Sequence, residues 1–194
     1  MDSNIRRAGR KAVSNSLDNR LKLPPIRVGT LKPEIILVPV DFTQCSQKAI
    51  TYAVSLAKLF KSQIILLHIS KLAPATPSPE FAVLQTDILN EQARDDAARQ
   101  LSQWLDQVAA HVPARMQVRV GVSAQEEIVD AATETQCDLI VMATHGKSGL
   151  AHWFSGSVAE KVVQRAPCPV FVVREREHDF IKPKTPRRRA LVPA

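Results

Sequence analysis

The sequence predicts an α/β protein with a doubly wound, Rossmann-like sheet of five parallel strands and four helices. Two observations lead to this prediction. From residue 34 onward, short aliphatic runs alternate with longer segments whose apolar residues recur at helical spacing, which is the pattern of repeated βαβ units. Most of these runs are continuously apolar, as expected for strands covered by helices on both faces.

The five predicted strands differ in how their apolar residues are arranged. Four contain four or more consecutive apolar residues, namely 34–40 (EIILVPV), 63–69 (QIILLHI), 138–143 (DLIVMA) and 169–173 (PVFVV). The remaining strand, 116–122 (MQVRVGV), alternates apolar and polar residues, so we expect it nearer an edge of the sheet. His68 lies inside an apolar run and is interpreted as a core histidine with satisfied hydrogen bonds.

The first helix is expected to begin at Thr43 or Ser46. Its apolar positions recur at spacings of one and three residues and form one face that packs on the sheet, and they are Ile50, Ala53, Val54, Ala57 and Phe60.

The other three helices carry recognisable boundary signals. Ser78 and Pro79 are expected to cap and open a second helix that runs to about Ala110. Ser123 with Glu126 forms a capping-box pattern for the third. The fourth is expected from about Gly156 to just before Pro167, because the residue preceding a proline disfavours helical geometry.

The connections between the strands fix the expected topology. Right-handed crossovers lead us to predict the strand order 3-2-1-4-5. In such a sheet the ligand crevice lies at the carboxyl ends of strands 1 and 4, where the winding direction reverses. The candidate functional residues should therefore be sought after residues 40 and 143.

Charge is distributed unevenly along the chain. The predicted globular domain, 34–174, lies between basic extensions at 1–33 and 175–194. Residues 1–33 hold eight basic and two acidic residues, whereas residues 34–173 hold eleven basic and fourteen acidic ones. Basic extensions can attract nucleic acid or an anionic membrane. We favour disordered, solvated ends, because neither contains interleaved aromatic residues or an amphipathic pattern.

The cysteines and apolar runs indicate a cytoplasmic protein. Cys45, Cys137 and Cys168 lie far apart in sequence, without a CxxC pair or zinc-ligand spacing, so neither a disulfide framework nor a metal site is expected. Cys168 is interpreted as a small buried hydrophobe. No apolar run approaches the roughly 20 residues of a membrane span. The N-terminus lacks a secretory apolar segment, although its arginines leave an organelle transit peptide as an alternative.

Two segments with possible ligand-binding chemistry meet at the expected crevice. Asp41 follows the first strand, where it can cap the next helix or accept a hydrogen bond from a ribose hydroxyl or an adenine amino group. Gly156 and Ser157 open the fourth helix, whose free N–H groups suit an anion. Lys147 is either a solvated loop lysine or a phosphate ligand, and the glycines alone could be ordinary turn residues.

Three segments within residues 34–174 match a known family, and they are VPVDFTQCSQKAI, IILLHIS and DLIVMATHGKSGLAHWFSGSVAEKVVQRAPCPVFVVR. Through these segments, residues 34–174 resemble the universal stress protein family. Nucleotide-binding members carry G-2x-G-9x-G-[S/T] after the fourth strand, which aligns here with Ala143, Gly146, Gly156 and Ser157. The resemblance implies that Asp41 lies near ribose and adenine and that the adenine pocket is lined by Pro39, Val40, Ile69 and Met142. On sequence alone, Ile69 and Met142 would be assigned to the core.

The resemblance implies an adenine nucleotide, ATP or AMP with or without Mg²⁺, as the ligand. Ala143 in place of the first glycine weakens this expectation, because its methyl group could crowd the ligand. The resemblance also implies a homodimer through 169–173, an apolar edge strand. We expect a regulatory binder that acts through an unidentified protein partner. The alternatives are a nucleotide-free interaction protein, which Ala143 favours, and a weak ATPase, because the fold can hold phosphates. No P-loop, GxGxxG fingerprint or nucleophile elbow is present, so a dedicated enzyme is not expected.

Overall fold

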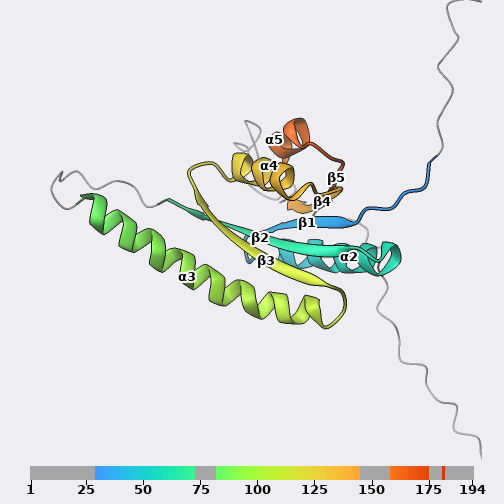
Figure 1. Cartoon of the computed structure of the whole chain (residues 1–194), viewed down its shortest axis with the longest axis horizontal. Helices are drawn as coiled ribbons and strands as arrows, with labels where there is room; N and C mark the ends of the chain where they lie inside the picture. The colour runs from blue at the N-terminus through green and yellow to red at the C-terminus, as the bar shows by residue number, and fades with distance from the viewer. Residues whose placement is uncertain (1–28, 73–81, 145–157, 175–180, 182–194) are drawn as a thin grey trace, which may run out of the picture. The chain divides into compact units, whose positions relative to one another are not determined.

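The predicted strand order is confirmed. The computed structural model describes residues 29–72, 82–144, 158–174 and 181. Five parallel strands form one sheet in the order β3-β2-β1-β4-β5 (Figure 1). The elements in chain order are β1 (Ile35–Val40), α2 (Gln44–Phe60), β2 (Gln63–Lys71), α3 (Ala82–Ala109), β3 (Ala114–Gly121), α4 (Ala124–Thr135), β4 (Leu139–Thr144), α5 (Val158–Arg165) and β5 (Val170–Arg174).

The helices cover the sheet in pairs, two on each face, as Figure 1 shows. One apolar cluster joins α2 and α3 to alternate strand residues such as Ile36, Val38 and Leu66. The other joins α4 and α5 to the intervening residues, such as Leu37 and Ile65. Because successive strand residues point to opposite faces, a strand buried on both sides must be apolar at every position. This explains the continuous aliphatic runs of the central strands.

Strand β3 occupies the edge position that its alternating sequence predicts. Its residues are mostly half-buried or exposed, and Met116 is 36% exposed. Its register partner in β2, Leu66, is fully buried. The other predicted strands agree with the observed bounds to within two residues.

Helix α2 is capped by Thr43, the earlier of the two predicted starts. The Thr43 side chain accepts a hydrogen bond from the Ser46 backbone N–H. Ala53 and Ala57 are buried as expected, and Ile50 and Val54 pack against the same cluster. The apolar face also contains Ala49 and Tyr52, among other residues.

Helix α4 begins where predicted, but without the predicted capping-box bond. Ser123 is the N-cap residue, yet its side chain makes no capping hydrogen bond. Within the described residues, Ser123 Oγ is buried without a hydrogen-bond partner. The backbone carbonyl of Ser123 instead accepts from the N–H groups of Glu126 and Glu127, at 3.1 Å each. The helix start is therefore held by the main chain.

The starts of α3 and α5 can be compared with the sequence only in part. The proposed caps at Ser78, Pro79 and Gly156 lie outside the described residues. Helix α3 ends at Ala109 and α5 ends at Arg165, both close to the predicted ends.

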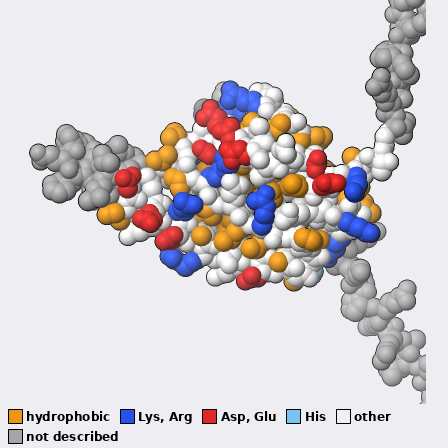
Figure 2. Space-filling view, viewed as in Figure 1, with side chains coloured by type: hydrophobic (Ala, Val, Ile, Leu, Met, Phe, Trp, Pro, Cys, Tyr) orange, Lys and Arg blue, Asp and Glu red, His pale blue; other side chains and the backbone are white. Residues whose placement is uncertain are grey.

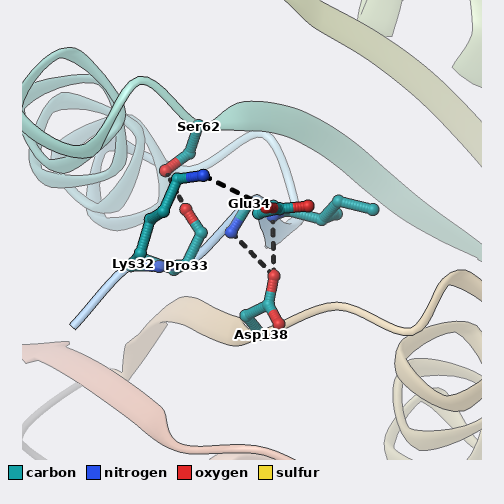
Figure 3. Close-up of polar contacts among 6 residues, drawn as sticks. Lys32, Pro33, Glu34, Ser62 and Asp138 are labelled. Atoms are coloured by element: carbon teal, nitrogen blue, oxygen red, sulfur yellow. Dashed lines mark hydrogen bonds and ion pairs between the residues drawn. The ribbon is translucent and has the colours of Figure 1, made fainter. Parts of the chain in front are cut away.

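The amino edge of the sheet is fastened by a carboxylate that the sequence analysis did not single out. Asp138 Oδ2 accepts hydrogen bonds from the backbone N–H groups of Glu34 and Ile35, at 2.7 and 3.0 Å (Figure 3). The buried Ser62 hydroxyl donates to the carbonyl of Pro33 at 2.6 Å. These contacts join the starts of β1, β2 and β4, so this edge has a structural role.

On the face drawn in Figure 2, acidic and basic side chains are interspersed over the described elements, with apolar side chains between them. None of the helices described is both long enough and apolar enough to cross a membrane. The basic extensions 1–33 and 175–194 fall almost entirely outside the described residues, so their expected disorder stays a prediction.

Candidate functional site at the carboxyl edge

The carboxyl ends of β1 and β4 lie at the same edge of the sheet, as the predicted crevice requires. In the β1–β4 pairing, Ile36 lies beside Leu139 and Leu37 beside Ile140, and both strands continue past these pairs toward their carboxyl ends. At the carboxyl end of β4, the carbonyl oxygen of its last residue, Thr144, lies 3.5 Å from Cys45 Sγ in the first turn of α2. The turn that follows β1 is therefore next to the end of β4.

Asp41 holds this turn together. Its Oδ1 accepts hydrogen bonds from the Thr43 N–H at 3.2 Å, from the Thr43 hydroxyl at 2.7 Å and from the Ser46 hydroxyl. The Asp41 N–H donates to Ser46 Oγ at 3.1 Å. Ser46 is buried, whereas Asp41 is exposed. Asp41 thus supports the start of α2, in line with the capping alternative, and the residue as a whole is exposed.

The residue after Asp41 has an unusual backbone conformation that no sequence pattern predicts. Phe42 has φ of 62°, in the left-handed region that bulky side chains avoid. Its ring packs 4.4 Å from the His68 ring and 5.4 Å from that of Trp104, measured between centroids. His68 is half-buried, and its Nδ1 lies 2.9 Å from the Val40 carbonyl oxygen, so one ring nitrogen of the predicted core histidine is hydrogen-bonded. Such a conformation costs about 1–3 kcal/mol, and similar conformations cluster at functional sites.

The predicted adenine-pocket residues end three neighbouring strands but divide between the two faces of the sheet. Met142 is buried on the α4 and α5 face, and Ile69 packs against the same cluster. Buried Pro39 belongs to this face by strand alternation. Val40 and Ala143 belong to the α2 and α3 cluster instead. Any pocket lined by Ile69 and Met142 would therefore lie on the α4 and α5 side.

Ala143 requires no glycine conformation. It is a half-buried β4 residue, and it is absent from the positive-φ non-glycine residues, which in the described part of the chain are Phe42, Lys61 and Gln136. Its methyl group packs with the α2 and α3 cluster, on the face opposite Met142. The methyl group that the sequence analysis treated as an obstacle thus points away from the face that carries Met142 and Ile69.

A shallow hollow of about 320 Å³ is lined by residues of β4, α5 and β5. It is mostly apolar, and its lining residues are Thr144, Ala159, Glu160, Val163, Gln164 and Val172. None of the predicted nucleotide residues that the structure describes lines this hollow.

Four of the predicted ligand residues, Gly146, Lys147, Gly156 and Ser157, lie outside the described residues. Their proposed contacts with phosphate therefore stay predictions. Within the part of the chain that the structure describes, no three His, Cys, Asp or Glu side chains gather as a metal-binding group.

Comparison with known proteins identifies the family. The model of the universal stress protein family matches residues 33–174. The universal stress protein MJ0531 of Methanocaldococcus jannaschii is 32% identical over 152 residues, which cover 77% of this chain and 87% of that protein. The chain belongs to the universal stress protein family.

Solved structures of universal stress proteins share the fold. Universal stress protein UspA from Lactobacillus plantarum is 25% identical, with a TM-score of 0.60, over 75% of this chain and all of that one. A universal stress protein solved in complex with cAMP is 21% identical, with a TM-score of 0.57, over 74% of this chain and 98% of that one. At this identity the second likeness shows the fold alone.

Proposed function

We propose that this universal stress protein binds an adenine nucleotide, ATP or AMP, at the carboxyl edge between β1 and β4, and acts as a regulatory binder. The observation that carries the proposal is the contact between Cys45 and Thr144, because it brings the turn that contains Asp41 next to the end of β4. In doubly wound sheets, ligands bind where strand order reverses, which here is between these two strands.

Further features of this edge support the proposal. Phe42, directly after Asp41, has a left-handed backbone conformation in the turn where a ligand would bind, and this conformation costs free energy. Ile69 and Met142 supply apolar surface on one face, and the exposed residue Asp41 supplies a carboxylate for a ribose hydroxyl or an adenine amino group. Gly146, Lys147, Gly156 and Ser157 would hold the phosphates, because free N–H groups at a helix start and a lysine side chain suit an anion. Mg²⁺ would bind with the phosphates.

We further propose a cytoplasmic homodimer that pairs through β5. This strand is at the sheet edge opposite β3, and its residues Val170, Phe171 and Val172 are only half-buried. Beside it, Val163 on α5 is 52% exposed. An apolar edge strand is a template for pairing with another chain, and a second copy would cover it. Nucleotide binding near the end of β4 could then alter the surface offered to a regulatory partner.

Two alternative functions are a nucleotide-free interaction protein and a weak ATPase. A nucleotide-free interaction protein is favoured by the engagement of Asp41 within its own turn. A weak ATPase would need a catalytic base near the phosphates, and the sequence offers no clear one.

Calorimetric titration separates these functions. We expect ATP, ADP or AMP to bind the full chain in the micromolar range, which corresponds to about 8 kcal/mol of binding free energy. The titration should be run with and without Mg²⁺, with cAMP included because a protein of the same fold was solved with it. No heat from any of these nucleotides would favour the nucleotide-free interaction protein. ATP hydrolysis well above that of a Gly156→Val variant would favour the ATPase.

A further inference from the structure

Two cysteines that are distant in sequence meet at the amino edge of the sheet. Cys137 lies between α4 and β4, and Cys168 lies between α5 and β5. Their Sγ atoms are 3.6 Å apart. Sequence spacing gave no reason to pair them, because the βαβ unit that connects them is what brings the starts of β4 and β5 side by side.

The neighbouring backbone of both cysteines is held in place. The Cys137 N–H donates to the Ala132 carbonyl at 3.1 Å, at the end of α4. The carbonyl of Pro169, next to Cys168, accepts a hydrogen bond from the Ile140 N–H at 3.0 Å, at the start of the β4–β5 pairing. An S–S bond of about 2.05 Å therefore requires the sulfur atoms to approach by only about 1.5 Å. The short Sγ–Sγ distance means that the two side chains point toward each other.

The two thiols differ in accessibility. Cys137 is 6% exposed, whereas Cys168 is half-buried. Burial, followed by the neighbouring Cys168, raises the pKa of Cys137 to about 12. Burial also raises the pKa of Cys168, but a hydrogen bond from the Cys137 thiol partly opposes this rise. Cys168 is therefore the thiol that an oxidant reaches first, and Cys137 is positioned to complete the reaction.

We propose that Cys137 and Cys168 are a pair that hydrogen peroxide oxidises slowly to a reversible intramolecular disulfide. The Cys168 thiolate attacks a peroxide oxygen, the O–O bond breaks, and a sulfenic acid forms on Cys168 while hydroxide leaves. The Cys137 sulfur then attacks the Cys168 sulfur, the S–O bond breaks, and the departing hydroxide takes the Cys137 proton as water. Two thiols lose two electrons and two protons, and one hydrogen peroxide becomes two water molecules.

The disulfide would affect the stability of the fold more than the binding of a nucleotide at the carboxyl edge. It would close a loop of about 30 residues that contains β4 and α5 and would restrict the unfolded chain, which stabilises the fold. Cys137 and Cys168 precede the strands β4 and β5, so they lie at the opposite edge from Asp41. Oxidation should therefore leave nucleotide binding largely unchanged, and the proposal stands independently of the proposed function.

Mass spectrometry of the full chain tests this pair. The protein is reduced with dithiothreitol, desalted, treated with hydrogen peroxide, alkylated with N-ethylmaleimide and digested. We expect a linked peptide pair containing Cys137 and Cys168, formed over minutes to hours because both thiols are largely protonated, and removed by dithiothreitol. The melting temperature of the oxidised protein should rise by about 5–10 °C.

Matched variants show whether the link is specific. Cys45→Ser should still form it, because Cys45 lies at the carboxyl edge against Thr144. Cys137→Ser and Cys168→Ser should not, and Cys137→Ala serves if the serine variant fails to fold. The proposal is wrong if peroxide leaves Cys137 fully alkylatable in the unfolded wild-type chain, if Cys168 becomes sulfinic acid instead, or if Cys168 links two chains.

Discussion

Replacing Asp41 by asparagine is expected to weaken ATP binding by 10- to 100-fold. The amide oxygen of asparagine can still accept from Thr43 and Ser46, as Asp41 Oδ1 does, so the turn should survive. The negative charge is lost, and a hydrogen bond to a charged group contributes about 1.5–3 kcal/mol. Calorimetric titration of wild-type and Asp41→Asn protein measures the change, and thermal unfolding should show melting temperatures within about 3 °C of each other.

Thr43→Ala is the matched control for this experiment. It removes the hydroxyl that donates to Asp41 and that accepts from the Ser46 N–H as the helix cap, but it leaves the carboxylate in place. Loss of such a cap costs about 1 kcal/mol, so the melting temperature should fall by about 2–4 °C. ATP affinity should stay within about threefold of wild type. Equal losses of affinity in both variants would mean that Asp41 acts only through the turn.

The largest expected effect on folding comes from the centre of the sheet. Leu66 is fully buried in β2 on the α2 and α3 face. Leu66→Ala should lower the free energy of unfolding by about 2–5 kcal/mol, because the cavity cannot fully collapse between strand and helix. This is a large part of the 5–15 kcal/mol that is typical of folded domains. Urea unfolding followed by circular dichroism measures the loss.

Met116→Ala provides the comparison for Leu66→Ala, because Met116 is the register partner of Leu66 in the edge strand β3. Its side chain is 36% exposed, so we expect a loss below about 1 kcal/mol. Similar losses at both positions would contradict the assignment of β2 to the interior and β3 to the edge.

The fold was predictable because its signals are local and repeated. A strand such as β4, with five consecutive apolar residues from Leu139 to Ala143, is expected between two layers of helices, and the alternating strand β3 is expected at an edge. Right-handed crossovers then leave little freedom in strand order. The predicted cap of α4 was right in position but wrong in chemistry, since the Ser123 side chain makes no capping bond. Rotamer choice depends on neighbours that a short motif does not specify.

The site was less predictable because its details depend on tertiary contacts. Asp41 could be placed at the crevice from its position after a strand, but the three hydrogen bonds that its Oδ1 accepts within the turn could not be predicted. The left-handed Phe42 is invisible in sequence, since the packing of its ring on His68 and Trp104 outweighs the local preference. The same holds for Cys137 and Cys168, which only the β4–β5 pairing brings together.

Methyl NMR tests the central claim most directly, because the chain has three methionines and only one of them belongs to the proposed site. In protein labelled at methionine methyl groups, saturating ATP should shift the Met142 signal and leave that of Met116, on the distant edge strand, unchanged. A Met142→Leu variant assigns the signal. If calorimetry shows that ATP binds but the Met142 signal does not move, the nucleotide lies elsewhere and the carboxyl edge between β1 and β4 is not its site.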